Sequence, residues 1–336
     1  MLGRATVLLF WLAVATESFA TPTFSLYFTN DPDGQFTSYY SSLSNNILAA
    51  ADNWAQYFPA TNNASILIEV QFVYSTTFLS SGFSVTSHFV TSTNGTNIFE
   101  QGAGAQVRTG GQSGSIPDIR FEIGTNYLVN TLWLDPNPRV RSYTVPPNKT
   151  DSMSVCLHEL CHAFAFNGWM DGMTGAFPGN YESTFDQWVQ FDGTNFYFYG
   201  PQAQSIYGKP VPVTYGNAFH VGNSSPRPGS DLIGDLMNGV VFTNGTRYYI
   251  SSLDLAVMAD TGLPIGQPLS LLADSQTNGA FRAEVAAPVG RSVRLEYSTT
   301  LTNWTALTNF ITTNVTTTVT DLNATNASRF YRAVLK

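Results

Sequence analysis

The chain of 336 residues has little cysteine and little charge. It contains two cysteines, Cys156 and Cys161, and 11% of its residues are charged, with 15 Lys and Arg against 23 Asp and Glu. Two cysteines exclude a framework of several disulfides. The net charge is −8, and the sequence has no basic stripe that could bind a phosphate backbone. We therefore expect no nucleic-acid partner.

A hydrophobic run long enough to span a membrane is missing after the first 20 residues. Residues 1–20 have the pattern of a secretory signal: Arg4 supplies the positive start, residues 7–15 the apolar centre, and Ser18-Phe19-Ala20 the cleavage site. The apolar run is too short to span a bilayer. We therefore expect an exported protein, extracellular or periplasmic, that has no membrane partner once the signal is removed.

Both cysteines lie in one predicted helix, which Thr150 or Asp151 caps at its start and Asn167-Gly168 ends. Residues five positions apart on a helix have Cα atoms separated by about 8.7 Å, on divergent faces. This distance exceeds the reach of a disulfide. We expect Cys156 and Cys161 to be buried free thiols.

The same helix carries the motif HELCH. His158 and His162 are four residues apart, so on a helix they lie about 40° apart around the axis and face one point in space. Two imidazoles in this arrangement supply two of the three protein ligands of a catalytic zinc. Glu159 lies at the edge of the same face, where it can accept a proton from zinc-bound water. The motif predicts one zinc ion and names Glu159 as the general base.

A third zinc ligand does not follow from the motif alone. The short pattern HExxHxxGxxH fails, because the chain has Ala165 and Gly168 where that pattern has glycine and histidine. One alternative is Glu182, which would make a thermolysin-like site with two histidines and a carboxylate. Asp186 follows it in an ExxxD spacing, although the segment has no clear helical pattern. The other alternative is His220.

His220 precedes DLMNG, whose Met237 is suited to a tight turn beneath the metal. HExxH, a distant histidine and a methionine turn in this order resemble the leishmanolysin-like zinc peptidases, which are metzincins. HELCHAFAFNG is similar to that family's HELGHxLGFxG, with Cys161 and Ala165 in place of glycines, and ISSLDLAVMADTGLP is similar to the helix after the turn. The resemblance covers residues 146–264 and favours His220 over Glu182. The disulfide framework of that family is absent here.

The order of predicted elements indicates an α+β catalytic domain over residues 21–266. Apolar spacing predicts strands at 23–29, 65–74, 118–124 and 131–135, a helix at 41–58, and a strand at 247–250. A capping box formed by Ser251 and Asp254 starts a last helix, which Gly262 and Pro264 end. The run 169–226 has no clear pattern. We expect a zincin-like fold, with a twisted sheet above the active-site helix and an edge strand that could pair with an extended peptide.

Residues 267–336 have a different character. No histidine or cysteine follows the linker Gly266-Gln267-Pro268, and alternating segments rich in threonine recur. These residues predict a small all-β sandwich domain with no catalytic group of its own. We expect it to bind a surface or a glycan, or to stabilise the chain.

The resemblance implies a secreted zinc endopeptidase acting on proteins or peptides. In this mechanism Glu159 takes a proton from the attacking water and returns it to the leaving amine. An alternative is an exported binding or adhesion protein with a structural or vestigial zinc site, and a third is a zinc hydrolase of non-peptide substrates. Calcium has less support: Asp171, Asp186 and Asp192 match no calcium-loop spacing, and we interpret them as turn residues.

Overall fold

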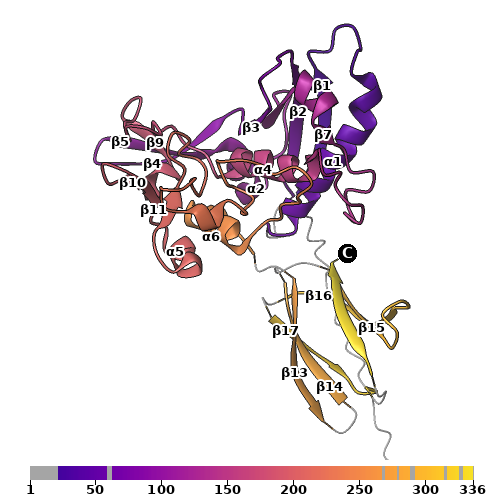
Figure 1. Cartoon of the computed structure of the whole chain (residues 1–336). Coiled ribbons are helices and arrows are strands. Elements are labelled where there is room, and N and C mark those ends of the chain that lie inside the picture. Colours follow the sequence, from indigo (N-terminus) through magenta and orange to yellow (C-terminus); the bar gives the residue numbers. More distant parts are fainter. Residues whose placement is uncertain are drawn as a thin grey trace, which may run out of the picture.

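The computed structural model describes residues 22–58, 63–266, 269–277, 280–287, 292–313, 316–324 and 328–335. The predicted signal at 1–20 and residues 267–268 of the predicted linker lie outside the described residues. The described part is mixed helix and sheet, with six α-helices and several sheets in its N-terminal part, followed by antiparallel strands alone (Figure 1). No described helix has both the length and the apolar character needed to cross a membrane.

A four-stranded sheet forms the centre of the N-terminal part. Its order is β1 (Thr23–Thr29), β2 (Ser65–Val73), β6 (Ile119–Gly124) and β3 (Ser80–Ser84). The first three strands are parallel, and β3 pairs antiparallel with β6. Alternate residues of β2 are fully buried, which places that strand at the centre of the core. The arrangement leaves β3 as an edge strand.

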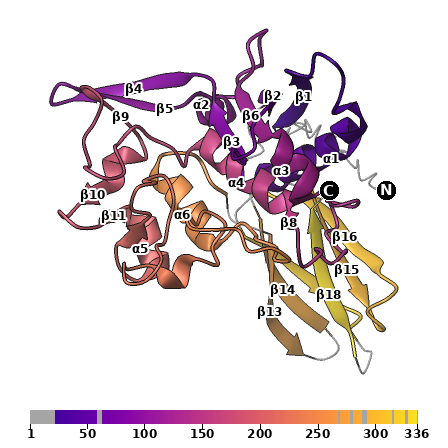
Figure 2. The ribbon, with the colours of Figure 1, turned by 45° about the horizontal axis from the view of Figure 1, so that its top comes forward.

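Six helices surround this sheet and the segments that follow it. They are α1 (Thr37–Ala55), α2 (Gly102–Thr109), α3 (Thr125–Asn130), α4 (Ser152–Phe164), α5 (Pro201–Tyr207) and α6 (Ser252–Asp260). Figure 2 shows α4 in the middle of the N-terminal part, beside β3. Every residue of α4 is buried, so this helix packs on all sides.

Local capping explains where α4 begins. The Asp151 carboxylate accepts hydrogen bonds from the backbone N–H and the hydroxyl of Ser154. The indole N–H of Trp54 on α1 donates to the Leu157 carbonyl at 2.9 Å, which ties the two helices together. Cys156 and Cys161 are buried and free, so the prediction that they form no disulfide is confirmed.

Several short elements lie outside the central sheet. One sheet contains β4 (Ser87–Thr93), β5 (Thr96–Gln101) and β9 (Tyr181–Ser183), another contains β10 (Val189–Phe191), β11 (Phe196–Phe198) and β12 (Val211–Val213), and β7 (Leu132–Trp133) pairs with β8 (Thr150–Asp151). Single 3₁₀ turns occur at Asp186–Trp188 and Ser230–Leu232. The run at 169–226, which showed no pattern in the sequence, therefore holds short ordered pieces, each too brief for a periodic signal.

The sequence predicted the long elements better than the short ones. Strands β1, β2 and β6 and the capping box of α6 are confirmed, and α1 begins at Thr37, before the predicted start at 41. The predicted strand at 247–250 is wrong. Its backbone meets side chains instead of a neighbouring strand: the Tyr248 N–H donates to the Ser154 hydroxyl at 2.8 Å. Strands β3, β4 and β5 were not predicted, because their Ser/Thr-rich segment lacks apolar alternation.

The C-terminal part consists of antiparallel strands, which confirms the predicted β character. One sheet has the order β13 (Ser270–Thr277), β14 (Ala280–Ala286) and β17 (Thr316–Asp321), and the other has β16 (Thr305–Ile311), β15 (Ser292–Ser298) and β18 (Phe330–Leu335). The buried residues Val285, Ala287 and Val293 draw a small core from both sheets. This core shares no residue with the large core of the N-terminal part.

Two separate cores predict that the N-terminal part folds without the C-terminal strands. A chain ending at Gly266 should keep its cooperative melting transition, with a Tm within a few degrees of that transition in the full chain. Calorimetry of the two chains measures this. Loss of the transition in the shortened chain would show that the two parts fold as one unit.

Candidate metal centre

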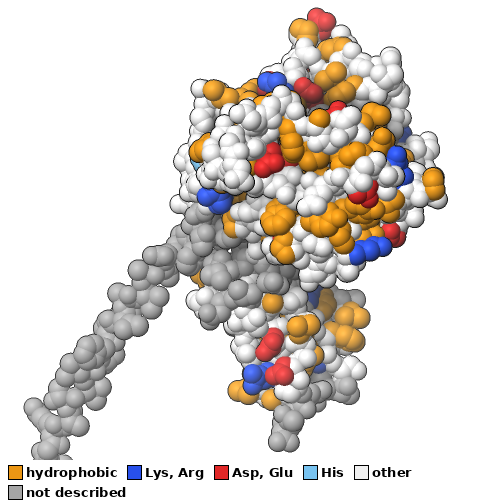
Figure 3. Space-filling view, turned by 90° about the vertical axis from the view of Figure 1, so that its left-hand side faces the viewer, with side chains coloured by type: hydrophobic (Ala, Val, Ile, Leu, Met, Phe, Trp, Pro, Cys, Tyr) orange, Lys and Arg blue, Asp and Glu red, His pale blue; other side chains and the backbone are white. Residues whose placement is uncertain are grey.

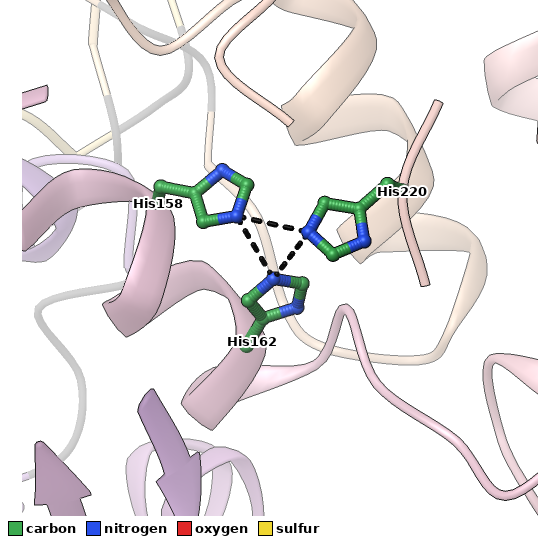
Figure 4. Close-up of side chains that lie close together, drawn as sticks. All are labelled: His158, His162 and His220. Carbon is green, nitrogen blue, oxygen red and sulfur yellow. Dashed lines mark hydrogen bonds between the residues drawn. The ribbon is translucent and has the colours of Figure 1, made fainter. Parts of the chain in front are cut away.

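Three histidines from two distant segments of the chain point their rings at one another (Figure 4). His158 and His162 come from α4, and His220 comes from the loop after β12. Their Nε2 atoms are separated by 3.0 Å, 3.1 Å and 3.0 Å. All three ligand atoms belong to one cluster that could hold a metal ion.

Carbonyl oxygens set the protonation of the two helix histidines. The Nδ1 of His158 lies 2.8 Å from the Leu236 carbonyl, and the Nδ1 of His162 lies 2.7 Å from the Phe166 carbonyl. A carbonyl only accepts, so each Nδ1 carries the proton and donates it. In a neutral ring the Nε2 then has a free lone pair, as a metal ligand requires.

Burial keeps these rings neutral. Burial lowers the pKa of His158 to about 4, and burial together with the neighbouring His158 lowers the pKa of His162 to about 4. The pKa of His220 is lowered well below its ordinary value, first by burial and then by the other two rings. Neutral imidazoles at pH 7 are ready to bind a metal without releasing a proton.

Three imidazole nitrogens at this separation could hold a metal ion. His158 and His162 carry their protons on Nδ1, so their Nε2 atoms cannot donate hydrogen bonds to each other and the two lone pairs repel each other. A tetrahedral zinc with Zn–N bonds of about 2.0–2.1 Å would separate its nitrogen ligands by about 3.3 Å. The observed separations of 3.0–3.1 Å are close to this value. The donor set therefore fits a divalent metal with three imidazole ligands.

Met237 lies in a tight turn that contacts two of the histidine-bearing segments. The turn runs from Asp235 to Asn238, where the Asn238 N–H donates to the Asp235 carbonyl and the Asp235 carboxylate accepts the Met237 N–H. Leu236 in this turn supplies the carbonyl that His158 binds. The Met237 carbonyl accepts the N–H of Val221, the residue after His220. The turn thus links two of the three histidines.

Gly239 follows this turn with no room for a side chain. A Cβ atom at Gly239 would lie 2.6 Å from the Cβ of His220 and 2.6 Å from the hydroxyl oxygen of Thr214. Any larger residue would displace the loop that carries His220.

Glu159 extends into the same cleft without joining the cluster. Its side chain is buried, and the hydroxyl of Ser80 on β3 donates to its Oε1 at 2.5 Å. Burial raises the pKa of Glu159, while the neighbouring His162 and hydrogen bonds from Ser80 and the backbone of Gly82 act in the opposite direction. Sequence reasoning missed Ser80, because a serine in a Ser/Thr-rich segment carries no signal of its own.

Strand β3 forms one rim of the cleft and turns part of its backbone away from the sheet. The Leu79 carbonyl and the Val85 N–H bond to the β6 side, so the alternate residues Ser80, Gly82 and Ser84 turn their backbone groups away from β6. The edge closes at Thr86, whose carbonyl accepts the Gly102 N–H. The predicted edge strand is therefore β3.

The cleft is a cavity of about 750 Å³ whose walls are almost uncharged. Apart from Glu159 and the three histidines, its walls are apolar or carry hydroxyl and amide groups. The lining residues include Leu79, Phe83, Tyr127, Thr131, Thr150, Val155, Asn167, Asn217, Phe219, Val240, Val241, Phe242 and Asn244. None of these is Lys, Arg or Asp. The cavity is large enough for several residues of a peptide.

A buried ionic cluster fixes the start of α4. Arg141 Nη2 lies 2.9 Å from the Asp151 carboxylate, and Arg247 Nη2 lies 2.8 Å from the Asp135 carboxylate. All four side chains are at most 11% exposed. Buried pairs of this kind destabilise strongly when one member is removed. The cluster holds the loop before α4 and the segment after the turn against the same helix end.

The alternative third ligand lies elsewhere. Glu182 is on β9, where it pairs with Ile98, and it is not part of the histidine cluster. Asp186 accepts the backbone N–H groups of Trp169 and Ser183, so it ties the chain after α4 to β9. The fourth histidine, His88, pairs with Glu100 on the β4–β5 hairpin and lies outside the cluster.

The remaining calcium candidates are turn residues, as the sequence indicated. Asp171 accepts the N–H groups of Met173 and Thr174, and Asp192 accepts those of Thr194 and Asn195. Their carboxylates accept hydrogen bonds from backbone N–H groups of their own turns.

Metal content separates His220 from Glu182. We expect about one equivalent of zinc per wild-type chain after dialysis. His220→Ala should lose it, with an affinity decrease beyond the ~10–100-fold that the loss of an outer partner causes, whereas Glu182→Ala should retain it. Atomic absorption on the dialysed proteins measures both. Zinc lost from Glu182→Ala and kept by His220→Ala would contradict this assignment.

No family model, curated protein or solved structure matches this chain. The site combines three converging imidazoles, a buried carboxylate beside them and a cleft under an edge strand, whose walls otherwise carry no Lys, Arg, Asp or Glu.

Proposed function

We propose that this protein is a secreted zinc-dependent endopeptidase of the leishmanolysin-like metzincin type, with a zincin-like catalytic domain. The observation that carries the proposal is the convergence of His158, His162 and His220 beside a buried Glu159 in a cleft bordered by an edge strand. The order of HExxH, the distant histidine and the methionine turn supports the family resemblance. The C-terminal strands lie outside the resemblance, and we propose that they bind a surface or a glycan, or stabilise the chain.

The residues of the site would have separate roles in peptide hydrolysis. His158, His162 and His220 would hold the zinc, which when bound activates a water molecule and polarises the substrate carbonyl. The backbone groups of β3 that face away from β6, other than the Gly82 group bound to Glu159, can pair with an extended peptide and set its distance from the histidines. Glu159 accepts the proton from the water and returns it to the leaving amine.

The position of Glu159 favours catalysis over a purely structural or adhesive role. Three imidazoles suffice to hold a metal, so the carboxylate is not needed for binding it. A carboxylate buried at 6% exposure costs free energy unless other groups stabilise it. This chain provides a hydroxyl donor from β3 for it. Such an arrangement is expected of a general base.

Removal of the base should abolish hydrolysis and leave the metal in place. Glu159→Gln keeps the shape of the side chain but removes the proton acceptor, so we expect kcat to fall by about 10²–10⁴-fold. Zinc content should equal that of the wild type, because Glu159 is not a ligand. Cleavage of casein with and without a chelator, together with metal analysis, measures this. Full activity in Glu159→Gln would refute the mechanism.

The uncharged walls of the cleft define the substrates it should accept. One side of the cavity is formed near the start of α4 by Tyr127, Thr150 and Val155, together with Val241 and Asn244 from the segment after the turn. Burial raises the pKa of Tyr127 to about 12, so its hydroxyl is neutral at physiological pH. A charged substrate side chain would enter this side without a partner, at a cost of roughly several kcal/mol. Uncharged residues are therefore preferred next to the scissile bond.

A single isosteric change should alter this preference. Asn244 lies at the exposed mouth of the cavity, and its side-chain oxygen accepts a hydrogen bond from the Thr150 hydroxyl. Asn244→Asp keeps that acceptor and adds a negative charge. Charges about 4 Å apart in water attract by about 1 kcal/mol, so kcat/KM for a lysine-bearing peptide should rise about five-fold relative to its neutral counterpart. The ratio measured over a matched peptide pair should be unchanged in Asn244→Gln.

A further inference from the structure

Strand β3 presents one face to the helices that carry the site. Ser80 donates to Glu159, Gly82 lies directly on α4, and the Ser84 hydroxyl accepts the Ala103 N–H of α2. These three alternate residues share one face of the strand, because side chains of a strand alternate. Ser81 lies between them and faces the other way.

Gly82 allows this strand to reach the carboxylate. A Cβ atom at Gly82 would lie 2.3 Å from the backbone oxygen of Glu159 and 2.5 Å from its Cβ. Only glycine permits so close an approach. The contact brings the Ser80 hydroxyl to 2.5 Å from Oε1, and the Gly82 backbone also hydrogen-bonds the carboxylate.

We propose that Ser80 is a positioning residue for the general base, holding the Glu159 carboxylate in its working orientation through the bond to Oε1. The inference deepens the proposed function and rests on it for its kinetic consequence. A carboxylate that accepts two donors from one strand cannot rotate freely about its last bond. Its remaining lone pairs are then held towards the cleft, where the water and the leaving amine exchange the proton.

The same strand is also the proposed binding edge for the substrate. Ser80 and Gly82 turn backbone groups towards the cleft while they hold Glu159. The distance between the bound peptide and the base is therefore set within one short strand segment. Ser80 should affect the chemical step and leave peptide affinity unchanged, because its hydroxyl bonds to the enzyme's own carboxylate.

The kinetic test uses Ser80→Ala with Ser81→Ala as the matched control on the opposite face. We expect kcat of Ser80→Ala to fall about ten-fold, the order expected for one hydrogen bond to a charged group, with KM and zinc content unchanged. Ser81→Ala should keep the wild-type kcat. An unchanged kcat in Ser80→Ala, an equal loss in Ser81→Ala, or a change confined to KM would each overturn the inference.

An isosteric pair protects this test against a folding defect. Ser80→Thr keeps the hydroxyl, and Ser80→Val replaces it by a methyl group at the same size. The threonine variant should retain kcat within about three-fold of the wild type, and the valine variant should show the ten-fold loss. Equal kcat in the two variants would contradict a role for the hydroxyl.

A measurement without substrate separates this inference from the proposed function. The carboxyl ¹³C resonance of Glu159, identified by its disappearance in Glu159→Gln, should move in metal-free Ser80→Ala at fixed pH and stay in place in Ser81→Ala. If the wild type cleaves no peptide while this resonance moves, the peptidase proposal fails and the contact stands. A resonance that does not move shows that Ser80 does not hold the carboxylate.

Discussion

The constraint on which this structure depends is the meeting of three neutral imidazole nitrogens about 3 Å apart in a buried place. His158 and His162 donate their Nδ1 protons to carbonyl oxygens of the protein, so their Nε2 lone pairs face each other and repel. Such an arrangement costs free energy that a bound cation offsets. Because His158 and His162 come from a helix and His220 from a distant loop, the cation would also link two parts of the fold.

Rigid surroundings let the chain hold these rings in place. The Arg141–Asp151 and Arg247–Asp135 pairs fix the start of α4, and Trp54 of α1 binds the helix backbone. Buried pairs are weak sources of net stability, but they tolerate few alternative geometries. The tight turn around Met237 then joins the ligand loop to the carbonyl that His158 binds. Hydrogen bonds from the residues around the histidines fix the orientation of the rings.

The local sequence was sufficient to predict the helix α4, its HExxH motif and its N-terminal cap. Four-residue spacing places His158 and His162 on one face of any helix, whatever surrounds it. Asp151 and the Ser251–Asp254 box act within one turn of chain, so their roles were also readable from sequence. The strand predicted at 247–250 failed because its backbone is held by distant side chains, which no local pattern records.

The sequence by itself determined two histidines and a carboxylate on one helix, because helix geometry converts spacing into direction. It left the third ligand open between His220 and Glu182. The tertiary structure decided that His220 joins the cluster, since a turn and a loop bring it there, while β9 holds Glu182 away. It also decided that β3 lies on α4 and that Ser80 meets Glu159. That contact spans 79 residues and depends on packing between separate elements, which no spacing along the chain specifies.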